Sequence, residues 1–183
     1  MSCNTVQGPS RMVNEIHICS LSNLLETVQH TDARYIISAI NPWSIPATPA
    51  GIADENHLRL AINDLDRPHI NLVHPELHHI SKLIEFAEHW NKDGALVIHC
   101  LAGISRSSAS AFIVACALNN TAPEPTIAQA LRQASSTARP NQLMVELADT
   151  LMNRSGRMIA AIKALSPGAA TMEAKTYSIP SCY

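Results

Sequence analysis

The chain is poor in aromatic residues and has no long apolar stretch. Aromatic side chains make up 4% of its 183 residues, so we expect alanine, leucine and isoleucine to supply most of the core volume. No apolar run reaches the roughly 20 residues that a membrane-spanning helix needs. We therefore expect no membrane partner. The length fits one domain that is large enough for a proper core.

Charge of either sign is also sparse. Lysine and arginine number 13, aspartate and glutamate number 15, and the formal net charge is −2. No basic block is present, which argues against nucleic acid as a partner. Four histidines cluster at His69, His74, His78 and His79. No cysteine or carboxylate with matching spacing accompanies them, so we expect solvated histidines and no metal.

The cysteines are few and scattered. They stand at Cys3, Cys19, Cys100, Cys116 and Cys182, without a repeated spacing. Such a set argues against a disulfide framework and for a reducing compartment. Residues 1–12 lack the charged and apolar regions of a signal peptide, so we expect a cytoplasmic protein. We expect Cys19 and Cys116 to pack in the interior.

The hydrophobic pattern predicts an α/β fold, with a central, mostly parallel sheet flanked by helices. The early part of the chain is rich in strands and the later part is rich in helices. We expect a loose leader over residues 1–14, a single domain over 15–165, and a loosely attached C-terminal tail over 166–183. The expected strands cover 16–19, 33–40, 58–62 and 95–98, and the expected helices cover 21–30, 75–92, 107–118, 125–135, 142–153 and 157–165.

The most informative segment joins an apolar strand to an apolar helix. Cys100 and Arg106 lie on it with five residues between them, and Gly103 gives the turn the backbone freedom that it needs. Successive N–H groups in such a turn, together with the positive end of the following helix, form an anion site. The spacing therefore predicts a phosphate cradle with a thiol at its mouth.

The residue types of this cradle suit a phosphate ester. Helix N-termini and nearby cations favour the thiolate form of a cysteine, so we expect Cys100 to be largely ionised near neutral pH. The planar guanidinium of Arg106 offers two donors to two phosphate oxygens at once. The hydroxyl of Ser107 is placed to hydrogen-bond the sulfur and to help it leave from a thiophosphate.

The run His99-Cys100-x-x-Gly103-x-Ser105-Arg106-Ser107 resembles the signature loop of the cysteine-dependent protein tyrosine phosphatases. The small dual-specificity branch and its bacterial relatives are the nearest match. The resemblance implies a phosphatase-like fold, with this loop between a central strand and a helix. It also implies phosphomonoester hydrolysis through a cysteinyl-phosphate intermediate, with no cofactor.

The resemblance also implies roles for single residues. Cys100 is expected to be the nucleophile, and Ser107 is expected to assist thiolate release. His99 is expected to lie behind the loop, where it orders the loop and tunes the thiol. Phosphate is expected to bind the loop, which comprises Leu101, Ala102, Gly103, Ile104, Ser105 and Arg106.

A phosphatase of this kind also needs a general acid, which protonates the leaving oxygen and then activates water. In the family this is an aspartate that follows a strand upstream of the cysteine. Leu58, Leu60 and Ile62 alternate as a strand, and Asp64 comes at its end. We prefer Asp64 for this reason, and Asp66 is the alternative.

Two further segments are candidates for the site. Asn141 lies in an Ala-Arg-Pro-Asn-Gln stretch between two predicted helices, where it either braces the signature loop or caps a helix. Arg139, in the same stretch, either contacts an anionic substrate or is a surface residue. Trp43 lies in the Pro-rich loop over 41–51, and we expect it to fold back on the core rather than to stack on a substrate.

The sequence therefore predicts a protein tyrosine phosphatase that acts on a phosphorylated protein or peptide, with dual specificity left open. A phosphatase for phosphoinositides, RNA 5′-phosphates or other small molecules is an alternative. The variable loop positions Leu101, Ala102 and Ile104 are apolar, which disfavours a polyanionic substrate. A phosphopeptide-binding pseudophosphatase is a further alternative, which the intact Cys100, Arg106 and Ser107, together with the presence of a candidate aspartate, disfavour.

Overall fold

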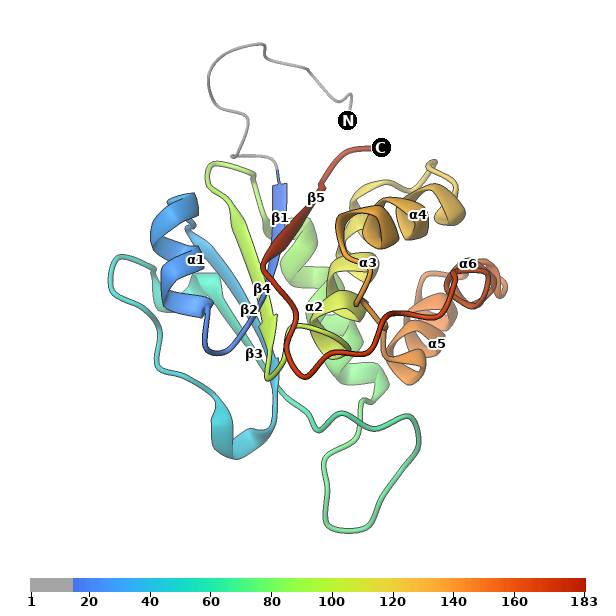
Figure 1. The fold of residues 1–183 in the computed structure, drawn as a ribbon, viewed down its shortest axis with the longest axis horizontal. Helices are drawn as coiled ribbons and strands as arrows, with labels where there is room; N and C mark the ends of the chain where they lie inside the picture. Colours follow the sequence, from blue (N-terminus) through green and yellow to red (C-terminus); the bar gives the residue numbers. More distant parts are fainter. Residues whose placement is uncertain (1–14) are drawn as a thin grey trace.

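The computed structural model describes residues 15–183 (Figure 1). Its centre is a five-stranded sheet with the strand order β3-β2-β4-β1-β5. The first four of these strands in space are parallel, and β5 at the edge runs antiparallel to β1. The strands are β1 (Glu15–Ser20), β2 (Tyr35–Ile40), β3 (His57–Ala61), β4 (Leu96–Cys100) and β5 (Tyr177–Pro180).

The two central strands, β2 and β4, are buried along their whole length. Both faces of a parallel sheet are covered by helices, so a strand in its middle has to be apolar throughout. The sequences Tyr-Ile-Ile-Ser-Ala-Ile and Leu-Val-Ile-His-Cys meet this demand, with Ser38 and His99 as polar exceptions. The predicted fold class, a central and mostly parallel sheet flanked by helices, is confirmed.

The helices divide unequally between the two faces (Figure 1). One face carries only α1, and the other carries α2 to α6, with α3 in the middle of that layer. Twelve of the thirteen residues of α3 are buried, because its side chains are small or apolar on every side. The helices are α1 (Leu24–Thr31), α2 (Leu77–His89), α3 (Arg106–Leu118), α4 (Glu124–Ala134), α5 (Gln142–Leu151) and α6 (Arg157–Lys163), and two short turns of 3₁₀ helix cover Pro42–Ser44 and Asp54–Asn56.

The carboxyl ends of the parallel strands all meet at one edge of the sheet. The chain leaves this edge in four connections, which follow β1, β2, β3 and β4 (Figure 1). In an open parallel sheet this is the edge at which ligands bind. The fold thereby brings together the loop after β2, the loop after β3 and the turn that links Cys100 to Arg106.

The prediction of a loosely attached C-terminal tail is wrong. Residues 177–180 form β5, which pairs with β1 so that Ile179 lies opposite Ile16. Before that strand the segment is fastened by Ala169, whose N–H donates to the Ser136 carbonyl, and by Gly168, whose carbonyl accepts from the Arg139 guanidinium. The strand was missed because it is only four residues long and ends at a proline. The predicted leader over 1–14 lies outside the described residues.

Two cysteines pack in the interior as expected, and a third forms a disulfide. Cys19 and Cys116 are buried free thiols, and burial raises the pKa of each to about 12. Cys182 is disulfide-bonded, which the scattered cysteine spacing did not predict. Within residues 15–183, no helix is both long and apolar enough to cross a membrane.

Two further expectations about surface and core are wrong. Trp43 is 70% exposed, because it lies on the short Pro42–Ser44 turn beyond the edge of the sheet and does not fold back on the core. His79 is buried rather than solvated, because its ring closes the first turn of α2 by accepting the N–H of Glu76. In the described part of the chain, no group of three His, Cys, Asp or Glu side chains is placed to hold a metal ion.

Candidate active site

The turn between β4 and α3 places Cys100 and Arg106 on either side of a tight loop. Cys100 is the last residue of its strand and Arg106 is the first residue of its helix. Between them Gly103 has a φ of +73°, which side chains rarely allow. A Cβ atom at this position would also lie 3.0 Å from the backbone of Cys19 and Ser20. The loop therefore packs directly on the end of β1, and only glycine fits there.

Surrounding segments hold the carbonyl groups of this loop from outside. The carbonyls of residues 101, 102, 104 and 105 each accept a backbone hydrogen bond from another part of the chain. Among residues 15–183, the backbone N–H groups of 101–105 have no acceptor. Carbonyls tied outward leave the N–H groups free for an anion, which is the geometry of a phosphate-binding nest. The four donors, in loop order, are the N–H groups of Leu21, Ala174, Arg139 and Asn141, at 3.2, 2.9, 2.9 and 3.3 Å.

Arg106 is buried and is held in position by one of its nitrogen atoms. Its Nη1 donates to the Asn41 side-chain oxygen at 2.8 Å and to the Ile62 carbonyl at 2.7 Å. Its buried Nε has no hydrogen-bond acceptor among the described residues. A buried donor without a partner is costly, so its persistence suits a site that an anion completes. Asn41 was missed by the sequence analysis, although a polar residue directly after a buried strand is a usable signal.

The Cys100 thiol lies beside a hydroxyl and in front of a neutral histidine. Its Sγ atom is 3.2 Å from the Ser107 hydroxyl, and both side chains are buried. Behind it, the His99 ring lies with Nδ1 3.4 Å from the Cys100 carbonyl and Nε2 2.6 Å from the Ser38 hydroxyl. Burial lowers the pKa of His99 to about 4, so the ring is neutral near neutral pH. The structure thus places the His99 ring between the Ser38 hydroxyl and the Cys100 carbonyl.

Asp64 lies against the signature loop. Its Oδ1 atom accepts hydrogen bonds from the Ser105 hydroxyl at 2.7 Å and from the Asn141 amide at 2.9 Å. Its Oδ2 atom is 3.9 Å from Nε of Arg106. One carboxylate oxygen is thereby anchored, and the other is turned toward the guanidinium that faces the cradle. Asp64 and Asp66 both line a cavity of about 420 Å³. Unlike Asp64, Asp66 makes no hydrogen bond or ion pair with another described residue.

The Asn141 side chain caps a helix and reaches the loop after β3, whereas the Asn141 backbone N–H donates to the Ser105 carbonyl of the signature loop. Its side-chain oxygen accepts the N–H of Met144 and caps α5, while its amide nitrogen donates to Asp64 and to the Leu65 carbonyl. Arg139 donates its guanidinium to the Gly168 carbonyl at 2.6 Å and thereby holds the C-terminal segment. Its backbone N–H, rather than its side chain, contacts the signature loop.

A C-terminal strap, residues 168–176, forms a further wall beside the loop. The N–H of Ala174 donates to the Ala102 carbonyl at 2.9 Å, and the Glu173 carboxylate accepts from the hydroxyls of Ser20 and Ser22. Hydrogen bonds from Ser20 and then Ser22 lower the pKa of Glu173. The strap was missed because the tail was expected to be loose, and its sequence carries no motif that marks it.

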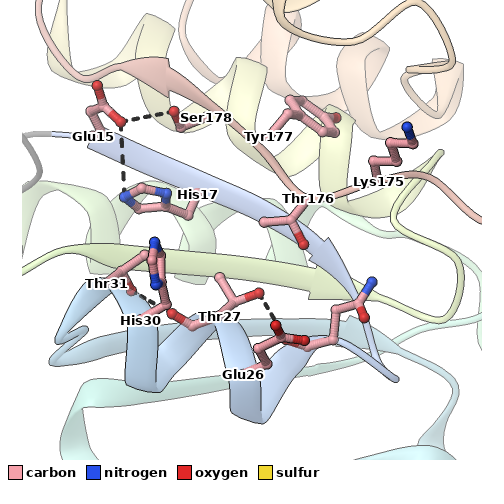
Figure 2. A pocket seen from close by; sticks show the side chains of 11 residues that line it. Glu15, His17, Glu26, Thr27, His30, Thr31, Lys175, Thr176, Tyr177 and Ser178 are labelled. Carbon is pink, nitrogen blue, oxygen red and sulfur yellow. Dashed lines mark hydrogen bonds and ion pairs between the residues drawn. The ribbon is translucent and has the colours of Figure 1, made fainter.

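A separate cavity of about 490 Å³ lies between β1, α1 and β5 (Figure 2). Figure 2 shows Glu15, His17 and Thr27 around it, with Ser178 donating to Glu15 at 2.8 Å. Glu15 begins β1, whereas the signature loop follows the carboxyl end of β4. No residue of the signature loop lines this cavity, so we place the candidate active site at the loop and not here.

Comparison with solved structures finds several phosphatases of similar fold. The structure of DUSP15 superposes with a TM-score of 0.60 at 17% identity, covering 82% of this chain and 92% of that one. The human DUSP28 structure gives 0.59 at 16% identity, covering 81% and 94%. PTPMT1 in complex with PI(5)P gives 0.60 at 15% identity, covering 79% and 94%. The chain has the fold of the small cysteine-dependent phosphatases.

This fold assignment comes from structure alone. No family model matches the sequence, and no curated protein matches it closely. At 14–17% identity the shared fold says nothing about substrate. The resemblance that the signature loop suggested is nevertheless confirmed at the level of the phosphatase fold, because the neighbours include dual-specificity phosphatases.

Proposed function

We propose that the chain is a cysteine-dependent phosphatase that hydrolyses phosphomonoesters, with phosphotyrosine in a protein or peptide as its substrate. One observation carries the proposal. The backbone N–H groups of residues 101–105 surround a buried thiol and have no acceptor among the described residues. The Nε atom of Arg106 also has no hydrogen-bond acceptor among them. A dianionic phosphate monoester supplies the acceptors that these donors lack.

In the first step of the proposed mechanism, the Cys100 thiolate attacks phosphorus in line with the leaving oxygen. The loop N–H groups and Arg106 stabilise the equatorial oxygens as charge shifts onto them. Asp64 gives its proton to the leaving phenolate as the bond from phosphorus to oxygen breaks. The Oδ2 atom of Asp64 carries that proton, because Oδ1 already accepts from Ser105 and Asn141.

In the second step, water hydrolyses the cysteinyl phosphate. Asp64, now ionised, takes a proton from the water as its oxygen attacks phosphorus. The bond from sulfur to phosphorus breaks and inorganic phosphate leaves. Ser107, whose hydroxyl lies 3.2 Å from the sulfur, donates a hydrogen bond to the departing thiolate. No metal or cofactor takes part in either step.

The surface around the cradle favours a protein substrate over a highly charged headgroup. Trp43, Ile70, Leu101 and Met172 are large apolar side chains with exposures of 70, 80, 52 and 93%. They lie on the connections after β2, β3 and β4 and on the strap, which are the segments around the signature loop (Figure 1). Leu101 belongs to the signature loop and lines a cavity together with Met172, so these two apolar side chains lie beside the anion site and suit an aromatic phosphoester.

The lipid alternative is the one that a structural neighbour raises, since PTPMT1 was solved in complex with PI(5)P. The signature loop of this chain holds no lysine, and its variable positions are Leu101, Ala102 and Ile104. A headgroup with several phosphates needs further cations near the loop. We therefore place phosphoinositides second, behind phosphopeptides.

The proposal is tested by turnover of para-nitrophenyl phosphate in the presence of a reductant and EDTA. The wild type is expected to turn over, and Cys100→Ser is expected to be inactive. Cys116→Ser is the matched control, because Cys116 is a buried free thiol on α3 that does not face the loop. Residual turnover by Cys100→Ser, or loss of turnover in EDTA, would refute the mechanism.

The substrate class is tested next with three probes at equal concentration. These are a phosphotyrosine peptide, the same peptide with phosphothreonine, and a vesicle that contains a phosphatidylinositol monophosphate. We expect the highest kcat/KM for the phosphotyrosine peptide. Comparable rates on the two peptides would establish dual specificity, and preference for the vesicle would overturn the substrate assignment while leaving the mechanism in place.

A further inference from the structure

A line of hydrogen bonds runs from the surface loop after β2 to the residue that precedes Cys100. The Nε2 atom of His99 lies 2.6 Å from the Ser38 hydroxyl, which lies 2.7 Å from Nε2 of His57. The Nδ1 atom of His57 is 3.0 Å from the Thr48 hydroxyl, which donates to Asp54 at 2.7 Å. We call these five residues, Asp54, Thr48, His57, Ser38 and His99, the relay. Its inner three members are buried on β2, β3 and β4.

The contacts of Asp54 at the outer end of the relay decide which atom donates in the hydrogen bond between Thr48 and His57. The guanidinium of Arg59 donates to Asp54 at 2.5 Å and also to Thr48. Hydrogen bonds from Arg59 and then from Thr48 lower the pKa of Asp54, so the carboxylate is ionised. The single hydroxyl proton of Thr48 is donated to that carboxylate. The Thr48 oxygen can then only accept from His57, which places a proton on Nδ1 of His57.

The donor and acceptor of each inner hydrogen bond follow from the outer ones, because each neutral ring carries one proton. Burial lowers the pKa of both His57 and His99 to about 4, so both rings are neutral near neutral pH. With its proton on Nδ1, His57 accepts the Ser38 hydroxyl proton at Nε2. The Ser38 oxygen then accepts from His99, whose proton lies on Nε2. The Nδ1 atom of His99 is left without a proton, facing the Cys100 carbonyl.

The number of protons available to the relay agrees with the lengths of its contacts. The relay has five contacts, if the one from His99 to the Cys100 carbonyl is included, and four protons to fill them. One contact must lack a proton. The first four measure 2.6 to 3.0 Å, whereas the last measures 3.4 Å, too long for a good hydrogen bond. The empty contact is the one next to the nucleophile.

We propose that Asp54, Thr48, His57 and Ser38 are positioning residues for Cys100, which act by setting the tautomer of His99. In the wild type, the Cys100 carbonyl receives no proton from His99. If the relay reverses or is cut, His99 carries its proton on Nδ1 and donates it to that carbonyl. This polarises the peptide group between residues 100 and 101, makes its N–H a stronger donor toward the cradle, and favours the thiolate.

The relay gives the exposed loop that carries Thr48 and Asp54 an influence on the thiol. Outside the relay, Arg106 acts on the His99 ring and Arg59 acts on the His57 ring, Asp64 is paired with Arg106, and Cys19 and Tyr177 interact with Cys100. Among these groups, a change at Asp54 directly alters only the pairing of Arg59. The catalytic meaning of the relay rests on the proposed function, but the tautomer of His99 does not, so the two are tested separately.

The tautomers are read from two-bond nitrogen–proton correlation spectra of the imidazole rings, with assignments from His57→Gln and His99→Gln. Near neutral pH we expect the wild type to carry Nδ1–H at His57 and Nε2–H at His99. Ser38→Ala removes the acceptor of His99, so His99 is expected to switch to Nδ1–H while His57 does not change. A wild type with Nδ1–H at His99 would overturn the relay.

Asp54→Ala is the second variant, and it changes only an exposed side chain. Without the carboxylate, Thr48 is free to donate to His57, so both rings are expected to switch tautomer together. Asp93→Ala is the matched control, because Asp93 is also exposed and also paired with an arginine, Arg34, at 3.6 Å. Unchanged rings in Asp54→Ala would overturn transmission from the surface, even if Ser38→Ala fails to fold.

The effect on Cys100 is read from the rate of its alkylation by iodoacetamide as a function of pH, which needs no turnover. The midpoint is expected to move to lower pH by a few tenths of a unit in Asp54→Ala and Ser38→Ala, and to stay in place in Asp93→Ala. Switched tautomers without a moved midpoint would overturn the positioning role. An inactive wild type with these tautomers and shifts would refute the proposed function and leave the relay established.

Discussion

The amide of Asn141 donates a hydrogen bond to the Asp64 carboxylate over 2.9 Å, although the two residues are 77 positions apart in the chain. This contact joins the first turn of α5 to the loop after β3, directly beside the signature loop. It anchors one oxygen of the proposed general acid and leaves the other toward Arg106. The placement of the acid therefore depends on a helix cap that lies outside the signature loop.

The roles of Asp64 and Asp66 are distinguished by how kcat of their variants depends on the leaving group of the substrate. Asp64→Asn is expected to lower kcat by about 10²-fold or more for phosphotyrosine, whose leaving group needs a proton, and by much less for an activated ester. Asp66→Asn is the matched control and is expected to retain activity, because Asp66 makes no contact with the cradle. Steady-state kinetics on the two esters measure this. The opposite result would move the acid to Asp66.

Asn141 is tested by variants that separate its two contacts. Asn141→Ser keeps an acceptor for the Met144 N–H but removes the donor to Asp64. We expect its melting temperature to stay near the wild-type value and its kcat for poor leaving groups to fall several-fold. Asn141→Ala loses the cap as well and is expected to lose about 1 kcal/mol of stability. Equal kcat in Asn141→Ser and the wild type would limit Asn141 to capping.

Ser107 is expected to act after the cysteinyl phosphate has formed. Ser107→Ala removes the hydroxyl that lies 3.2 Å from the Cys100 sulfur, so the thiolate should leave more slowly. Rapid-quench experiments should then show a burst of the first product, followed by slow turnover. Ser110→Ala is the control, because that buried hydroxyl on α3 bonds only the Arg106 carbonyl. A slowed burst would instead place Ser107 in the first step.

Much of the site could be predicted because its residues are close in sequence. Cys100, Gly103, Arg106 and Ser107 share one short turn, whose strand and helix are marked by apolar runs. Local chemistry is enough to infer a phosphate cradle from such a segment. The central strands were predictable for the same reason, since a strand covered on both faces must be apolar along its length.

The missed residues depend on contacts between distant segments. Asn41 meets Arg106 across 65 positions, and Ser38 meets His99 across 61. The local sequence marks Asn41 and Ser38 only as polar residues after or within a buried strand, and the strand order alone brings them to their partners. Glu173 is a similar case, because its bond to Ser20 spans 153 positions and depends on β5, a strand that the sequence pattern did not reveal. Trp43 was misplaced because an aromatic residue carries no signal of its exposure.

The C-terminal strap is expected to support the signature loop. Glu173→Ala removes the carboxylate that accepts from Ser20 and Ser22, so the strap should separate from the end of β1. We expect faster hydrogen exchange over residues 168–176 and 100–106, together with a raised KM. Glu146→Ala, at an exposed site on α5, is the control. Exchange that rises in the strap alone would show that the loop does not depend on it.

His79 links the stability of the fold to pH. Burial, with a further contribution from His78, lowers the pKa of His79 from 6.5 to about 4. As pH falls from about 6.5 to about 4, the unfolded chain binds a proton that the folded chain does not bind, so stability falls with pH over this window. Below about 4 both states are protonated at this ring and the loss ends. The neutral ring accepts the Glu76 N–H, and protonation would break that bond.

His79→Gln removes this titration and keeps the cap, because glutamine at the third position of a helix accepts the same N–H. We expect similar unfolding free energies for variant and wild type near neutral pH. Between about pH 6.5 and 4, the unfolding free energy of the variant should fall by on the order of 1 kcal/mol less than that of the wild type, as measured by urea unfolding. Some loss should remain, since His57 and His99 also have pKa values lowered to about 4 by burial. His30→Gln, at an exposed position on α1, is the control. If the unfolding free energy depends on pH equally in His79→Gln and in this control, His79 does not titrate with folding.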